Sequence, residues 1–195
     1  MGQEVFTPEQ QSLLLQVARE AIQYGWEQKK AWQPDPSRYP EALRLPRAVF
    51  VTLTVAGDLR GCIGILEPGS TLVENVAKYA YAAAFQDARF PDLSEAEIPK
   101  LEIHISILSL LEPMTFQSEE DLMAQIRPGI DGLLLEDGYH RGTFLPAVWE
   151  DLPEVRDFLR RLKGKAGLPA DYWSDQLRVR RYTTTSISDA ATPHP

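Results

Sequence analysis

Apolar and polar residues alternate most regularly between Leu101 and Leu108. Successive side chains of an extended chain point to opposite faces, so this pattern predicts a β-strand with one buried and one polar face. Only one register removes the whole apolar set from water, and it turns inward Leu101, Ile103, Ile105 and Ile107.

Two segments near the start of the chain have the spacing of helices. Thr7-Pro8-Glu9-Gln10 combines a capping threonine, a proline in the first turn and a glutamine three residues after the cap. Apolar residues then recur at helical spacing as far as Lys30. Thr71 and Glu74 form a second capping box, and the alanine-rich apolar face that follows ends near Asp87. Both segments therefore predict helices that pack closely on other elements.

The remaining pattern is dominated by hairpins. β-branched and aromatic segments at 49–56 and 59–65 flank Gly57-Asp58, and Asp137-Gly138 separates a second pair of strands at 133–135 and 139–144. The other elements expected are an irregular proline-rich loop at 33–46, a short acidic helix from Ser118, a helix opened by Pro153 and a last strand at 177–187. Helices lie between hairpins instead of alternating with single strands. This order predicts an α+β fold with a mainly antiparallel sheet flanked by helices, and disfavours a doubly wound parallel sheet.

The length of the chain predicts one domain, and its composition excludes several classes of protein. With 195 residues, 44% of them hydrophobic, the chain can bury a substantial core. We expect a single domain over residues 5–188 and a loose tail at 189–195. There is no apolar run of about 20 residues and no secretory signal, which predicts a cytoplasmic protein. The single cysteine, Cys62, rules out a disulfide framework and a cysteine-based zinc site.

The charge is uneven along the chain. The net charge is −8, which disfavours nucleic acid as a partner, yet residues 160–182 contain seven basic and two acidic side chains, a local balance of +5. Such a stretch is typical of a solvated face, and the alternative is a surface that binds phosphate groups, as in RNA. The aromatic-interleaved basic pattern of common RNA modules is missing, so we rank RNA binding last.

Several motifs follow one another in an order that identifies a family. Arg60-Gly61-Cys62-Ile63-Gly64 lies on the returning strand of the first hairpin. It is followed by Ala82-Ala83-Ala84-Phe85-Gln86-Asp87-Ala88-Arg89-Phe90-Pro91, Leu101–Leu108, Gly142-Thr143-Phe144-Leu145-Pro146 and Lys165-Ala166-Gly167-Leu168. This succession resembles the AMMECR domain family, named from a human chromosomal region linked to Alport syndrome and elliptocytosis.

The resemblance implies more about the fold than about a reaction. It implies a larger and a smaller lobe around an antiparallel sheet. Bacterial and archaeal members of the family are labelled protein A of the AmmeMemoRadiSam system, which implies a Memo-like protein and a radical S-adenosylmethionine protein as partners. The family has also been labelled as an RNA-modification group, without an established reaction.

The most specific motif contains candidate ligand-binding residues. Gly61 and Gly64 have no side chain to hinder a substrate that approaches the backbone, and Arg60 offers a planar donor group for a carboxylate or phosphate. Strand alternation would place Arg60, Cys62 and Gly64 on one face. Alternatively, the glycines accommodate a bulge or a helix crossing, and Cys62 is a small buried residue.

Candidate catalytic residues surround this motif in the sequence. A thiol needs a base or a positive neighbour to become the reactive thiolate, and among the three histidines His104 is the one placed to act as a base for Cys62, although an exposed histidine on a sheet is the commoner outcome. Asp87 is the alternative proton carrier. Arg89 would join Arg60 in binding an anion, or would form a local ion pair with Asp87 that fixes a turn.

The leading hypothesis is an enzyme, or a component of one, that handles a small anionic or nucleotide-like substrate at residues 60–64. The alternative is a non-enzymatic binding module. No Walker A loop, dinucleotide fingerprint, H-E-x-x-H motif or nucleophile elbow is present. The sequence leaves the cofactor unknown. No metal site is predicted, because a metal ion held by Cys62 and His104 would need at least one further ligand.

Overall fold

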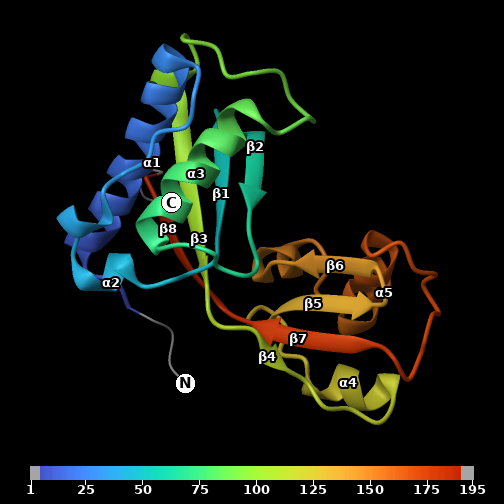
Figure 1. Cartoon of the computed structure of the whole chain (residues 1–195). Helices are drawn as coiled ribbons and strands as arrows, with labels where there is room; N and C mark the ends of the chain where they lie inside the picture. Colours follow the sequence, from blue (N-terminus) through green and yellow to red (C-terminus); the bar gives the residue numbers. More distant parts are fainter. Residues whose placement is uncertain (1–4, 190–195) are drawn as a thin grey trace, which may run out of the picture. The chain divides into compact units, whose positions relative to one another are not determined.

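The computed structural model describes residues 5–189 and divides them into two compact units (Figure 1). The first unit contains the described chain up to Leu108 and again from Thr185 onward, and the second is Ser109–Thr184. Each unit has its own four-stranded sheet and its own hydrophobic core. The α+β fold with antiparallel sheets and two lobes of unequal size is therefore confirmed.

The sheet of the first unit has the strand order β2-β1-β3-β8, so β2 is an edge strand. The elements of this unit, in chain order, are α1 (Pro8–Gln28), η1 (Pro36–Arg38), α2 (Glu41–Arg44), β1 (Val49–Val55), β2 (Asp58–Gly64), α3 (Leu72–Phe85), η2 (Ile98–Lys100), β3 (Leu101–Leu108) and β8 (Thr184–Ser188).

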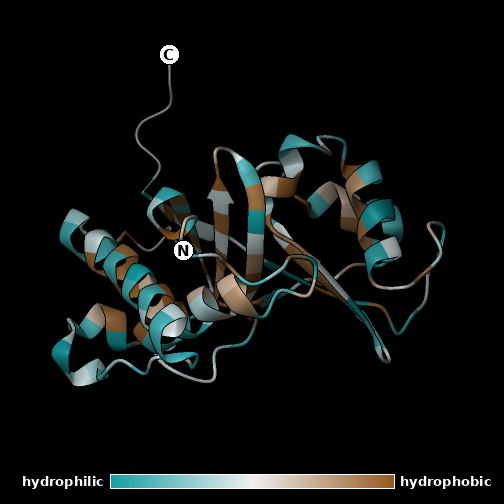
Figure 2. Ribbon diagram, turned by 90° about the horizontal axis from the view of Figure 1, so that it is seen from above, coloured by the Kyte–Doolittle hydropathy of each residue, from teal (hydrophilic) through white to brown (hydrophobic). Residues whose placement is uncertain are grey.

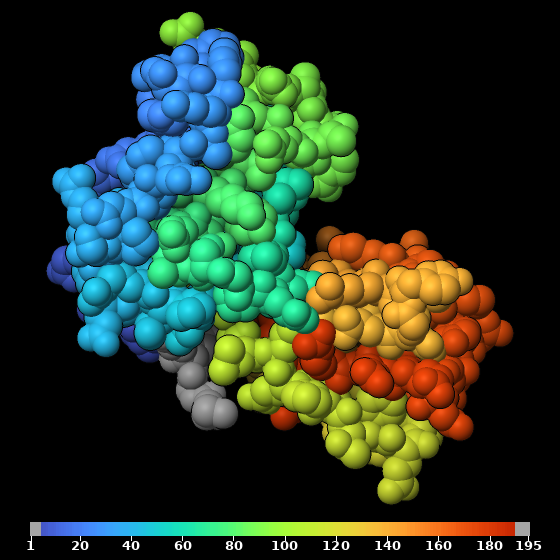
Figure 3. Space-filling view, viewed as in Figure 1, coloured from blue at the N-terminus to red at the C-terminus, as the bar shows by residue number. Residues whose placement is uncertain are grey.

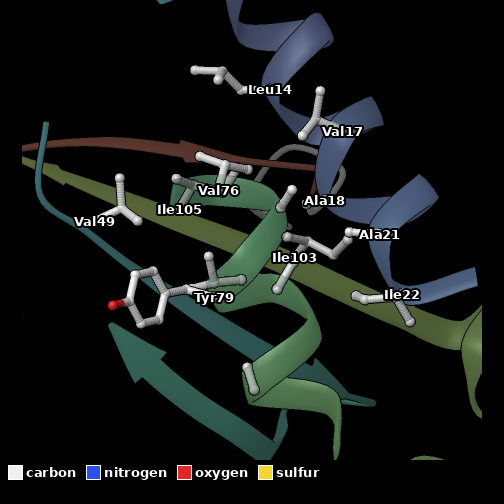
Figure 4. Close-up of a cluster of buried hydrophobic side chains, with 14 of the residues drawn as sticks. Leu14, Val17, Ala18, Ala21, Ile22, Val49, Val76, Tyr79, Ile103 and Ile105 are labelled. Carbon is white, nitrogen blue, oxygen red and sulfur yellow. The ribbon is translucent and has the colours of Figure 1, made fainter. Parts of the chain in front are cut away.

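Helices α1 and α3 pack against each other and cover one face of this sheet (Figures 1 and 3). Both begin with the predicted capping box, at Thr7 and at Thr71. Brown and teal positions alternate along α1 in Figure 2, as expected of a helix with one apolar face. Figure 4 shows Ala18, Ala21 and Ile22 of α1 in the same cluster as Ile103 of β3.

Strand β3 begins and ends where the sequence predicts. Its alternate side chains are almost completely buried, at 4% exposure for Leu101, 1% for Ile103, 0% for Ile105 and 3% for Ile107. The predicted register is therefore confirmed, and the apolar face of β3 lies under the helices.

The second unit contains the sheet β4-β7-β5-β6 and two helices. Trp149 and Phe158 stack in its core with ring centroids 3.7 Å apart. The buried amine of Lys163 pairs with Glu119 at 2.7 Å, which joins the two helices. The elements, in chain order, are β4 (Glu112–Pro113), α4 (Glu119–Gln125), β5 (Gly132–Asp137), β6 (His140–Phe144), η3 (Pro146–Glu150), α5 (Val155–Lys165) and β7 (Arg178–Tyr182).

Three predictions need correction. The last strand is two strands, because the chain leaves the second sheet after Tyr182 and enters the first at Thr184. The proline-rich segment contains a short helix, α2, since Pro40 can precede a helix and Glu41 suits its first turn. Asp189, predicted to lie in the tail, is held in place, because its carboxylate accepts the backbone N–H of Ile103 at 2.6 Å and pairs with Arg19. The rest of that tail, 190–195, lies outside the described residues.

Within residues 5–189 no helix combines the length and the hydropathy that crossing a lipid bilayer requires.

Candidate functional site

The pairing of β2 with β1 contains an irregularity at the first residue of the motif. Leu53 lies opposite Gly61 and Thr54 lies opposite Leu59, so Arg60 is an extra residue without a partner on β1. A bulge of this kind interrupts the alternation of side chains. Simple alternation therefore does not decide whether Arg60 shares a face with Cys62 and Gly64.

The backbone of Cys62 is bound by an ion pair at the free edge of β2. The carboxylate of Asp87 accepts the N–H of Cys62 at 2.9 Å, and a guanidinium nitrogen of Arg89 lies 3.3 Å from the carbonyl oxygen of Cys62 as its donor. In an antiparallel strand the N–H and C=O of one residue point to the same side. Asp87 and Arg89 therefore occupy the position that a further strand would take.

The two side chains are also bound to each other. Arg89 donates to Asp87 from Nε at 2.9 Å and from Nη2 at 2.6 Å. The Asp87 side chain is 5% exposed, whereas that of Arg89 is 58% exposed. The bonds from Arg89, and that from the Cys62 backbone, hold the pKa of Asp87 well below its usual range. The charged form of Asp87 is thus favoured, which argues against its predicted role as a proton carrier.

The side chain of Cys62 belongs to a row of three residues that crosses the sheet. Thr52 of β1 is directly opposite both Cys62 of β2 and His104 of β3, and directly opposed residues share a face. The hydroxyl of Thr52 donates to Sγ of Cys62 at 3.2 Å. This face is the one opposite α1 and α3, since Leu53 and Ile103 on the neighbouring positions are buried in the core.

His104 is therefore two strands away from the thiol, which corresponds to about 10 Å between Cα atoms. Thr52, and not His104, is the partner of the sulfur. The imidazole is exposed on its strand, yet the surrounding strands desolvate it enough to lower its pKa. The structure thus places His104 in the row without making it a direct base for Cys62.

Arg60 is engaged in a second clamp on the same strand. Its Nε donates to Glu97 at 2.6 Å and its Nη2 donates to the carbonyl of Asp92 at 3.1 Å. Glu97 also accepts from the backbone and hydroxyl of Ser94, and Arg60 and Ser94 together lower the pKa of Glu97 to about 2. Nη1 of Arg60 is buried and has no hydrogen-bond partner within residues 5–189. Arg60 and Arg89 are each paired with a carboxylate of the chain, Glu97 and Asp87.

The glycines of the motif are explained by packing within the chain. A Cβ atom at Gly61 would lie 2.0 Å from the carbonyl oxygen of Ala83 in α3, and one at Gly64 would lie 2.3 Å from that of Val49 in β1. Close approach of backbone is a standard reason for glycine in a strand. The prediction that these glycines make room for a ligand therefore gains no support.

Two important residues escaped the sequence analysis. Thr52 could not be found, because the register that puts it beside Cys62 is a tertiary property. Glu97 had a readable signal, since Ser94 and Glu97 have the spacing of a capping box. Both residues contact a member of the predicted motif.

The basic stretch of the second unit is partly neutralised. Arg180 pairs with Glu136, Arg181 with Glu112 and Lys163 with Glu119. Three of the seven positive charges that suggested a phosphate-binding surface are thus matched by carboxylates. Over the described residues, no cluster of three or more His, Cys, Asp or Glu side chains is arranged to hold a metal ion.

Comparison with known proteins decides the family. A family model described as AMMECR1 matches residues 15–187, which includes the second unit, most of the first and the whole site. The chain belongs to the AMMECR1 family. A protein of Methanothermobacter thermautotrophicus is 37% identical over 171 residues, covering 87% of this chain and 88% of the relative. A protein of Thermotoga maritima is 36% identical over 171 residues, covering 87% and 91%.

The AMMECR1 fold is also seen in a solved structure. The crystal structure of an uncharacterized protein from Pyrococcus horikoshii has a TM-score of 0.86 against this chain at 32% identity, covering 95% of this chain and 94% of that one. Membership of the AMMECR1 family thus accounts for the architecture of this chain. Its function is inferred from the geometry of the site.

Proposed function

We propose that this protein binds a small carboxylate- or phosphate-bearing molecule beside Cys62, and that it acts as a cytoplasmic enzyme or as a component of one. Arg89 is the group that receives the negative charge. The thiol of Cys62 lines the site.

The observation that carries this proposal is the state of Arg89. Its guanidinium is fixed from one edge by the buried carboxylate of Asp87, and still more than half of the side chain is exposed. An arginine that is already oriented loses little conformational entropy when an anion binds. The ring of Phe90 lies 5.4 Å from the guanidinium carbon and supports it from one side.

The chemistry of the thiol supports an enzymatic role. The hydroxyl of Thr52 donates to the sulfur of Cys62, and the guanidinium of Arg89 donates to the backbone carbonyl of the same residue. Thr52 lies on a strand and Arg89 on a loop tied to a strand, which is how reactive groups are kept in position.

Ligand protection of the thiol tests the proposal. Inorganic pyrophosphate and adenosine monophosphate are titrated against the whole protein while iodoacetamide labels Cys62, with adenosine as the uncharged control. If the two anions bind beside Cys62, they should slow the labelling of this residue by iodoacetamide, whereas adenosine should not. Arg89→Gln should abolish this protection, whereas Arg160→Gln, a change at an exposed arginine of α5, should leave it intact. Equal labelling rates with and without the anions, or equal protection in Arg89→Gln, would contradict the proposal.

A further inference from the structure

A groove of about 500 Å³ lies in the first unit between α1 and the segment that leads into β3. Its walls come from Ile22 and Gln23 of α1 and from Ile98 and Pro99 of the opposite segment. The side chains of Leu101 and Ile103 that line it point to the helix-covered face of the sheet, whereas Cys62 lies on the other face. The groove is therefore separate from the site beside Cys62.

The lining combines an apolar floor with an acidic rim. The groove is open to solvent, and its accessible apolar surface comes from Ile98 and Pro99, because Ile22, Leu101 and Ile103 are each at most 4% exposed. A small molecule in a typical pocket has most of its surface enclosed, which an open groove does not provide. The shape fits a longer segment that lies across the surface.

The charges at the rim decide what such a segment would contain. Two carboxylates, those of Glu20 and Glu95, and one guanidinium, that of Arg19, line the groove. Arg19 pairs with Asp189, a further carboxylate, and donates to the carbonyl of Leu101 at 3.1 Å. The charge left for a partner is negative, in keeping with the net charge of −8 of the chain.

We infer that this groove docks a partner protein through a segment that presents apolar side chains together with lysine or arginine. The apolar side chains contact Ile98 and Pro99, and the cationic groups pair with Glu20 and Glu95. Because the accessible apolar area is small and the charges are exposed, binding is weak, reversible and sensitive to salt.

The test uses the whole protein with 13C-labelled isoleucine methyl groups and three synthetic ten-residue peptides. One peptide alternates leucine with lysine, the second alternates leucine with glutamate, and the third replaces leucine by serine and keeps the lysines. The leucine–lysine peptide should shift the methyl resonances of Ile98 and Ile22 in a saturable manner, and the other two should not. Octylamine, a small apolar ammonium compound, distinguishes a small-molecule site, because it should cause no saturable shift.

Charge reversal provides the matched control. Glu20→Lys with Glu95→Lys should weaken binding of the leucine–lysine peptide by about tenfold, since two surface attractions become repulsions. Glu120→Lys with Glu150→Lys, at two exposed carboxylates of the second unit, makes the same change in net charge elsewhere and should leave the affinity unchanged, and Glu120→Lys alone serves as the milder control. The inference is overturned if the groove methyl groups do not shift, if the leucine–glutamate peptide or octylamine binds as well, or if Glu120→Lys with Glu150→Lys weakens binding to the same degree. None of these results bears on the anion site at Arg89.

Discussion

The carboxylate of Asp87 accepts the backbone N–H of Cys62 at 2.9 Å. The thiol-bearing residue is thereby held at its backbone by one element, the loop after α3, and at its sulfur by another, strand β1. Edge strands leave backbone groups unpaired, and at Cys62 an ion pair satisfies them. The position of the only thiol is thus fixed independently of any ligand.

Asp87→Asn should destabilise the protein, because an amide cannot hold Arg89 as a charged partner and turns one acceptor into a donor. We expect a loss of about 2–4 kcal/mol in the free energy of unfolding at neutral pH. Urea denaturation measures it. Asp171→Asn, at an exposed position, is the control and should cost less than about 0.5 kcal/mol. Similar losses for the two variants would show that the ion pair does not contribute to stability.

Thr52→Val should slow the reaction of Cys62 with iodoacetamide at neutral pH by several-fold, because valine keeps the shape of threonine and lacks the donor to Sγ. Thr52→Ser retains the hydroxyl and should react at close to the original rate. Mass spectrometry of the labelled protein follows both rates. If valine and serine behave alike, the hydroxyl does not tune the thiol, and if the thiol reacts only after denaturation, it is a packing residue.

The pair between Arg60 and Glu97 should make stability depend on pH in the acid range. The pKa of Glu97 is about 2 in the folded protein against an ordinary value of 4.5. The folded state therefore binds this proton more weakly than the unfolded state does. The stabilisation is present above pH 4.5 and is lost as the pH falls toward about 2.

Glu97→Gln should accordingly lower stability at pH 7 by about 1–3 kcal/mol and should flatten the fall of stability on acidification. Urea denaturation at a series of pH values measures this. Glu95→Gln, two residues away and exposed, serves as the control and should retain the original profile. A Glu97→Gln profile parallel to that of the original protein would show that the pair does not contribute.

Gly61→Ala should be strongly destabilising, because its Cβ would lie 2.0 Å from a backbone oxygen of α3 that cannot move away alone. We expect a loss of about 3 kcal/mol or more. Gly69→Ala is the matched control, since no atom lies within 4 Å of a Cβ built there. Thermal unfolding of the two variants should differ by many degrees, and equal midpoints would refute the close approach of β2 to α3.

Elements with a local signal can be predicted from the sequence. The capping boxes at Thr7 and Thr71 and the alternation in β3 depend on residues a few positions apart, and the structure has all three. Features decided by distant contacts cannot be predicted in this way. The bulge at Arg60 follows from how β2 fits β1, and the division of the last strand follows from which sheet edges are free. β-propensity is continuous across Thr183 and cannot indicate either.

The candidate site shows the same limit. The sequence singled out Cys62, Asp87 and Arg89, and the structure places these three in contact. It could not foresee that Arg60 would be bound by Glu97, because a surface arginine has the same appearance in a sequence whether it binds a ligand or a loop. Nor could it exclude His104 as a partner of the thiol, since the order of strands in the sheet separates them.

The last strand of the chain completes the first sheet, and this has a consequence for how the protein is made. On the ribosome the N-terminal residues emerge first, yet β3 has no neighbour on one side until residues 184–188 have been synthesised. Until then β3 has one unpaired edge, and the second unit is synthesised before the first sheet is complete. The unit that contains Cys62 can therefore be completed only after residues 184–188 have been synthesised, and a chain that ends between β3 and β8 leaves β3 unpaired on that side.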